Sequence, residues 1–159
     1  MRQNGFTLVE VLIVIAIAGI LMGIASMNFG RWSTKSNIEG QTREMYSDMM
    51  NARMLAMNRN RVHFVRMNTT QYTIRDDSNE NGTYETTDTL VLQKDMRNQI
   101  QWNGNPPTNI DVRFDSKGIA LDQGIISVTN TVGASYDCIE VSQARLDMGQ
   151  MNGGACVKK

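Results

Sequence analysis

The chain has 159 residues, with 16 basic and 16 acidic side chains, one histidine and two cysteines. This length suits one compact domain, and a formal net charge of zero provides no global field that would attract nucleic acid. The sequence also lacks a G-x-S-x-G pattern, an H-E-x-x-H pattern and a glycine-rich phosphate loop. We therefore expect a protein that is not an enzyme.

The N-terminal segment is strongly apolar. From Phe6 to Met27 the only strongly polar side chains are those of Thr7, Glu10 and Ser26. About 20 helical residues, at about 1.5 Å rise each, span a hydrocarbon layer of about 30 Å. A secretory signal peptide would have a shorter apolar core, followed by a small-residue cleavage site. We therefore predict a transmembrane helix over residues 6–27.

The same helix is expected to continue through residues 28–60. Side chains at spacings of three and four residues form one stripe, which predicts an amphipathic helix that buries Ile38, Thr42, Met45, Met49, Ala52 and Ala56. Charged residues occupy the other faces. The many methionines here are interpreted as adaptable packing side chains and not as a metal or electron-transfer site.

Beyond residue 60 the hydrophobic period changes to two, and β-forming residues gather in short runs between turn formers. The predicted strands are 61–67, 71–75, 89–93, 110–114, 125–129 and 136–141. Residues 61–159 are therefore predicted to form a β-rich head. The predicted fold class is α+β, with a long N-terminal helix packed on an antiparallel β-sheet.

Glu10 is the most informative single residue, because a carboxylate within an apolar span is costly unless a partner compensates it. The alternative is an interfacial side chain that snorkels near a helix end. The run Gly5-Phe6-Thr7-Leu8-Val9-Glu10, followed by VLIVIAIAGIL, closely resembles the prepilin signature of type IV pilins and pseudopilins.

This resemblance implies a leader over residues 1–5, which a membrane aspartyl peptidase removes after Gly5, and N-methylation of the new amine on Phe6. It also implies that this cationic amine pairs with Glu10 of the same or a neighbouring subunit, which removes two otherwise costly buried charges. The implied partners are major and minor pilins or pseudopilins, the prepilin peptidase and an inner-membrane assembly platform. The implied location is the bacterial inner membrane, with a periplasmic head, and then the pilus or pseudopilus.

The remainder resembles minor pseudopilins of the GspH/FimT group, through Phe114-Asp115-Ser116-Lys117-Gly118 and Ile139-Glu140-Val141-Ser142. The resemblance implies a minor pilin, placed at the tip or in the assembly-initiating complex of a type IV pilus. A type II secretion pseudopilin is an alternative. A plain membrane-anchored periplasmic protein is another, and in that protein Glu10 would be dispensable.

Some members of this group bind DNA through a C-terminal Gly-Arg-x-Arg motif, where this chain reads Ala144-Arg145-Leu146-Asp147. Asp147 places an anion where a phosphate-binding cation is needed. DNA binding during natural transformation is therefore a less favoured alternative, carried by Arg145, Lys158 and Lys159.

A second basic group lies where the helix is expected to give way to the first strand. Alternate residues of a strand face opposite ways, so its members do not share one face. We interpret the group as solvated surface: Arg59, Arg61, His63 and Arg66.

The segment 77–88 reads DSNENGTYETTD and fits the calcium-loop spacing D-x-[DN]-x-[DN]-G. The candidate ligands are Asp77, Asn79, Asn81, Thr83, Glu85 and Asp88. The loop ends in Asp where the pattern has a bidentate Glu, and no clear helix follows. An acidic hairpin turn without calcium is therefore the alternative.

The two cysteines, Cys138 and Cys156, lie close together near the C-terminal end. In a periplasmic head they are expected to form a disulfide that pins the C-terminal tail. Two free buried thiols are the alternative. A zinc site would have only His63 to join the cysteines.

Overall fold

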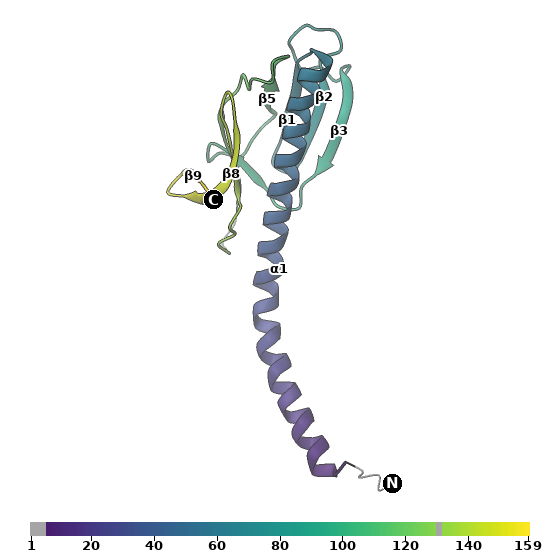
Figure 1. The fold of residues 1–159 in the computed structure, drawn as a ribbon, viewed down its shortest axis with the longest axis vertical. Coiled ribbons are helices and arrows are strands. Elements are labelled where there is room, and N and C mark those ends of the chain that lie inside the picture. Colours follow the sequence, from purple (N-terminus) through teal and green to yellow (C-terminus); the bar gives the residue numbers. More distant parts are fainter. Residues whose placement is uncertain (1–5, 130–131) are drawn as a thin grey trace. The chain divides into compact units, whose positions relative to one another are not determined.

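The computed structural model describes residues 6–129 and 132–159, without the side chains of residues 24–28. The chain divides into two compact units, Met1–Thr34 and Lys35–Lys159. One helix, α1 (Leu8–Arg59), precedes the strands (Figure 1). The strands of the described residues are β1 (His63–Met67), β2 (Gln71–Asp76), β3 (Thr89–Asp95), β4 (Ile100–Trp102), β5 (Ile110–Phe114), β6 (Gly124–Val128), β7 (Cys138–Val141), β8 (Leu146–Asn152) and β9 (Ala155–Lys158).

The helix begins directly after Thr7, whose hydroxyl accepts a hydrogen bond from the backbone N–H of Glu10 (3.2 Å). This bond satisfies one of the N–H groups that a helix start leaves unpaired. The apolar side chains that follow are exposed all around the helix, from Leu8 (77 %) to Met22 (73 %). No helix in the described ranges is long and apolar enough to cross a membrane. The predicted span of residues 6–27 includes residues 24–27, whose side chains the structure does not describe.

The helix ends with a backbone arrangement typical of helix C-termini. Asn60 adopts a positive φ of 54°, and the N–H of Arg61 donates to the carbonyl of Ala56 at 3.1 Å. Asparagine tolerates this left-handed conformation better than most residues. The chain can therefore reverse direction and enter β1 directly after the helix.

The stripe predicted on the C-terminal half of α1 is the buried face. Its six members are each at most 2 % exposed: Ile38, Thr42, Met45, Met49, Ala52 and Ala56. The hydroxyl of Thr42 donates to the carbonyl of Ile38 (2.9 Å), so its burial leaves no unpaired donor. The residue period therefore identified the core face of the helix.

Within the described residues the strands form two antiparallel sheets, ordered β3-β2-β1-β5 and β4-β6-β7-β8-β9. Figure 1 shows β1, β2 and β3 beside the C-terminal half of α1. Side chains from both sheets join the helix stripe in one core, among them Val65, Ile74, Val112, Ile126, Ile139 and Val141. The α+β prediction is confirmed, with two sheets in the head.

Polar contacts also tie the helix to the first sheet. The Tyr72 hydroxyl donates to Oδ2 of Asp48 (2.6 Å), and Nζ of Lys94 lies 2.7 Å from carboxylate oxygens of both Asp48 and Glu44. Burial and the hydrogen bond to Asp48 raise the pKa of Tyr72 above its ordinary value. The phenol therefore remains protonated and keeps donating at neutral pH.

Three strands were not predicted. β4 has only three residues, and β8 (LDMGQMN) lacks β-branched and aromatic side chains. β9 occupies the segment predicted to be a loose tail. Its hairpin with β8 turns at Gly153 and Gly154, which have φ values of 59° and 89°. Glycine adopts such values without steric cost.

Candidate assembly site

Phe6 and Glu10 line one shallow groove of about 280 Å³ near the start of α1, here called the N-terminal groove. Its other lining residues are Val11, Val14 and Ile15, so Glu10 is the charged member of an apolar surface. Phe6 is 83 % exposed, and Glu10 is also exposed. The two residues on which the assembly prediction rests therefore lie beside each other.

Glu10 also fits the local chemistry of a helix start. The run Thr7-x-x-Glu10 is a capping-box pattern, and a carboxylate in the first turn complements the positive end of the helix dipole. The sequence interpretation overlooked this role of Thr7, although the T-x-x-E spacing is visible in the sequence. Glu10 thus has a local role beside any role between subunits.

The chemistry of the groove depends on the state of Phe6. In the uncut chain the nitrogen of Phe6 belongs to a peptide bond and carries no charge. Cleavage after residue 5 would convert it into a cationic amine four residues from Glu10. The predicted cleavage position Gly5, with the rest of the predicted leader, lies outside the described residues.

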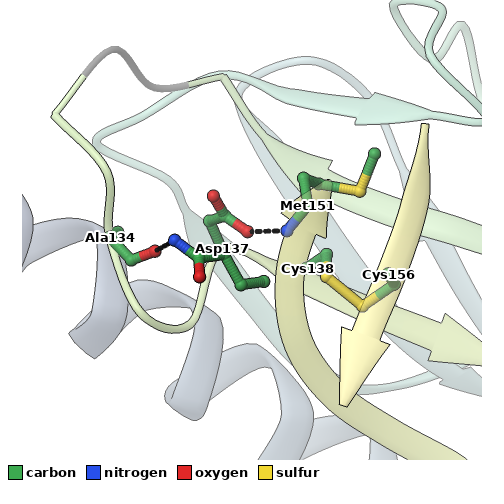
Figure 2. The surroundings of a disulfide bond; sticks show 6 residues. Ala134, Asp137, Cys138, Met151 and Cys156 are labelled. Carbon is green, nitrogen blue, oxygen red and sulfur yellow. Dashed lines mark hydrogen bonds between the residues drawn. A yellow bond between two sulfur atoms is a disulfide. The ribbon is translucent and has the colours of Figure 1, made fainter. Parts of the chain in front are cut away.

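The head is closed near the C-terminus by a disulfide between Cys138 of β7 and Cys156 of β9, with Cα atoms 5.9 Å apart. The two strands flank β8, where Cys138 pairs with Gly149 and Cys156 with Met151. Figure 2 shows the bridge beside Asp137, which accepts a hydrogen bond from the backbone N–H of Met151 (2.6 Å). The predicted disulfide is confirmed, and it joins two strands where a loose tail was expected.

Gly149 permits this close packing of β9 on β8. A Cβ atom at position 149 would overlap the backbone carbonyl of Val157. Because backbone atoms cannot swing aside as a flexible side chain does, the position requires glycine. This requirement was not visible in the sequence, where Gly149 instead lowered the strand propensity of β8.

The basic group at the end of α1 is not a free cationic patch. Its arginines form ion pairs with acidic residues of the head: Arg59 with Asp76 (2.8 Å), Arg61 with Glu80 (3.1 Å) and Arg66 with Asp111 (2.5 Å). His63 is fully buried, so the interpretation as solvated surface was wrong for this residue. Its strand position turns the imidazole toward the core, and burial lowers its pKa.

The three candidate DNA contacts lie at the C-terminal end of the head. Nζ of Lys158 forms an ion pair with Oδ1 of Asp147 (2.6 Å), and this hydrogen bond lowers the pKa of Asp147. Arg145 and Lys159 are exposed. Because Asp147 neutralises one of the three cations, fewer counterions would be released on binding a phosphate backbone.

The acidic segment 77–88 connects β2 to β3. Asp77 and Asp88 are buried, at 1 % and 3 % exposure. The carboxylate of Glu85 accepts hydrogen bonds from the side-chain amides of Asn79 (2.9 Å) and Asn81 (3.1 Å). In the part of the chain that the structure describes, no three His, Cys, Asp or Glu side chains form a group that could hold a metal.

An apolar helix with one carboxylate near its start, continuing into a half that packs on antiparallel sheets, defines a pilin-like subunit. Residues 1–26 match the prokaryotic N-terminal methylation motif. Residues 41–144, more than half of the chain, match the family described as type II transport protein GspH. The chain belongs to this family of pilin-like proteins. This chain has no significant match among the curated proteins or the solved structures.

Proposed function

We propose that this chain is a minor pilin, a structural subunit that a prepilin peptidase matures and that packs through its N-terminal helix into a pilus-like fibre. Residues 1–5 form the leader, and residues 6–27 hold the precursor in the inner membrane before assembly. The head, residues 61–159, lies in the periplasm. The methylation motif over residues 1–26 supports the processing step.

The observation that carries the proposal is the charged side chain of the N-terminal groove. Glu10 lies among exposed apolar side chains of α1. Because contact between such a surface and water is unfavourable, we expect lipid or other subunits to cover it. A carboxylate that enters such surroundings needs a cation. The amine produced on Phe6 by cleavage supplies one, in the same subunit or in its neighbour.

Replacement of Glu10 by leucine tests this proposal. Leucine keeps the segment apolar, so membrane insertion should be at least as efficient as in the wild type. We expect Glu10→Leu to reach the membrane and to be cleaved normally, but to fail in restoring fibres to a deletion strain. The measurements are the membrane level of the protein, its mass, the yield of sheared fibres and the recovery of other pilins in pull-downs.

Two control variants separate the possible reasons for a defect. Glu10→Gln retains side-chain size and removes the charge, so it should fail like Glu10→Leu if pairing with an amine is required. Thr7→Ala removes the hydroxyl that caps the helix and keeps the carboxylate. Normal fibres with Glu10→Leu, or an equal defect in Thr7→Ala with intact cleavage, would contradict the charge-pairing role.

For the host assembly we propose a type IV pilus, in which the chain acts at the tip or in the initiating complex. A type II secretion pseudopilus is the second candidate, supported by the description of the matching family. Deletion of the gene distinguishes them. Loss of surface pili with normal protein secretion supports the first, whereas loss of secretion with normal pili supports the second.

A further inference from the structure

The loop over residues 77–88 has no part in the proposed assembly function, yet its sequence has the spacing of oxygen-bearing side chains that is typical of calcium loops. Oxygen-bearing side chains occur at its first, third, fifth and twelfth positions, which are Asp77, Asn79, Asn81 and Asp88. Gly82 at the sixth position has a φ of 71°. Calcium loops have a glycine at this place because the chain turns sharply there.

The first half of the loop is wound around Asp77. Its carboxylate oxygens accept the backbone N–H groups of Asn81 (3.1 Å) and Gly82 (2.8 Å). The amide oxygen of Asn81 accepts the N–H of Thr83 (2.7 Å), and that of Asn79 accepts the N–H of Asn81 (3.1 Å). Each of these oxygens has a second lone pair that remains available to a cation.

Glu85 sets the orientation of the two amides. Both Asn79 and Asn81 donate through Nδ2 to its carboxylate. In a side-chain amide the oxygen and the nitrogen lie on opposite sides of the terminal carbon, so each Oδ1 is directed away from Glu85. Glu85 therefore positions the two amides, and the oxygen donors of the loop are two carboxylates and two neutral amides. Such a set holds only two carboxylates, so it is not a group of three His, Cys, Asp or Glu side chains, of which the described residues contain none.

Asp88 provides an independent observation at the other end of the loop. It is 3 % exposed, and its Oδ2 accepts the backbone N–H of Glu85 (2.9 Å), which turns the carboxylate toward the loop. Its Oδ1 is buried and has no hydrogen-bond partner among the described residues. A buried acceptor without a partner destabilises the fold, and more so when it is charged.

Among the described residues, no arginine forms an ion pair with either of these two buried carboxylates. Arg59 pairs with Asp76, and Arg61 pairs with Glu80. Arg75 directs its Nη1 to the backbone carbonyls of Thr86 (3.0 Å) and Asp88 (2.5 Å). Two buried anions on one short loop, one with an unsatisfied oxygen, are stabilised most directly by a small hard cation.

We propose that the β2–β3 loop binds one Ca²⁺ through Asp77, Asn79, Asn81 and Asp88. The inference is independent of the filament role. By ordering the loop, the ion would also fix the position of Tyr84, whose ring packs against Phe64 and Arg66 of β1. Tyr84 lies edge-on to Phe64 with centroids 6.0 Å apart, and the guanidinium carbon of Arg66 lies 3.5 Å from its ring centroid.

Calorimetric titration of the full chain in detergent micelles, stripped with EDTA, tests the site with calcium chloride as the probe. We expect one ion per chain with a dissociation constant of about 10⁻⁴ to 10⁻³ M, the range of extracellular calcium modules. Asp88→Asn and Asn79→Ala should each weaken binding by about 10-fold or more. The matched control is Asp95→Asn on β3, an exposed carboxylate outside the loop that should leave binding unchanged.

Asn79 is exposed, so Asn79→Ala keeps the test decisive if Asp88→Asn fails to fold. Calcium should also raise the Tm of the wild type and not that of the two loop variants. An absence of heat and of any Tm shift at about 10 mM calcium would overturn the proposal. Wild-type affinity in Asn79→Ala, or an equal loss in Asp95→Asn, would also overturn it.

Discussion

At the scale of single residues, His63 is a titratable side chain that the fold of the head buries. It is the only histidine of the chain and is fully buried, opposite Asp76 in the β1–β2 pair. Nδ1 lies 3.3 Å from the carbonyl of Arg61, and Nε2 is buried without a partner among the described residues. Burial lowers the pKa of this imidazole more than the nearby carboxylate of Asp76 raises it. The folded state therefore favours the neutral imidazole of His63.

This burial predicts that the head loses stability in mild acid. Below about pH 6.5 the unfolded chain protonates its histidine while the folded chain does not, so the free energy of unfolding falls as pH drops. The fall continues until the pH passes below the lowered pKa of the folded state. Above about pH 6.5 the imidazole is neutral in both states and contributes no pH dependence. Urea unfolding of the full chain between about pH 5 and 7.5 measures the effect.

The matched variant is His63→Gln, which retains a polar side chain and cannot titrate. Its stability should change less with pH than that of the wild type, whatever its absolute value. Arg113 and Lys158 lower the pKa values of Asp122 and Asp147, so these carboxylates titrate only at more acidic pH. Wild-type stability that is constant or increases on acidification to about pH 5 would contradict a buried neutral imidazole.

At the scale of elements, the second sheet depends on a covalent link at its edge. β9 is short and lies at the end of the order β4-β6-β7-β8-β9, where it pairs only with β8. Its side chains are mostly exposed, so it buries little apolar surface. The bond from Cys156 to Cys138 attaches this weak edge to a buried position of β7.

Loss of the disulfide should therefore weaken β9 first. The double variant Cys138→Ala with Cys156→Ser should lower the free energy of unfolding by about 3 kcal/mol, the chain-entropy value for a loop of this size. Amide exchange should become faster in β8 and β9 and remain slow in β1 and β2. Reduced wild-type protein is the control and should match the variant. An unchanged urea midpoint after complete reduction would disprove a stabilising role.

At the scale of the whole molecule, the two units have different surfaces. The unit Lys35–Lys159 has its own core, whereas the described apolar side chains of the unit Met1–Thr34 are largely exposed. Exposed apolar surface of this kind is typical of a segment that functions in contact with lipid or with other chains. Phe29 and Trp32, each 65 % exposed, continue this surface near the C-terminal end of the unit.

Processing should act on the start of the first unit without altering the second. Coexpression with an active prepilin peptidase should remove residues 1–5 and add the mass of a methyl group, as the methylation motif implies. Intact-mass analysis measures both changes. Gly5→Leu should remain at full length, as should the wild type with an inactive peptidase, and both should keep the disulfide. A wild-type chain that stays uncut beside the active peptidase would exclude maturation of this kind.

Much of the architecture could be predicted from the sequence, because it depends on interactions between near neighbours in the chain. Helical periodicity identified the buried stripe from Ile38 to Ala56, and alternation located β5 with both of its ends. The short pattern around Phe6 and Glu10 was sufficient to predict the methylation motif that residues 1–26 match. Two nearby cysteines were sufficient to predict the bridge between Cys138 and Cys156.

Only the tertiary structure decided which polar groups are buried and which cations are paired. Phe64 faces away from α1 yet is 1 % exposed, because Tyr84 from the following loop packs against it. Ion pairs such as Arg66 with Asp111 join residues far apart in the chain. β8 and β9 form a hairpin despite the weak strand propensity of β8, because its pairing with β7 and the disulfide compensate. Burial and pairing depend on what the rest of the chain brings to a residue, and no local pattern encodes that.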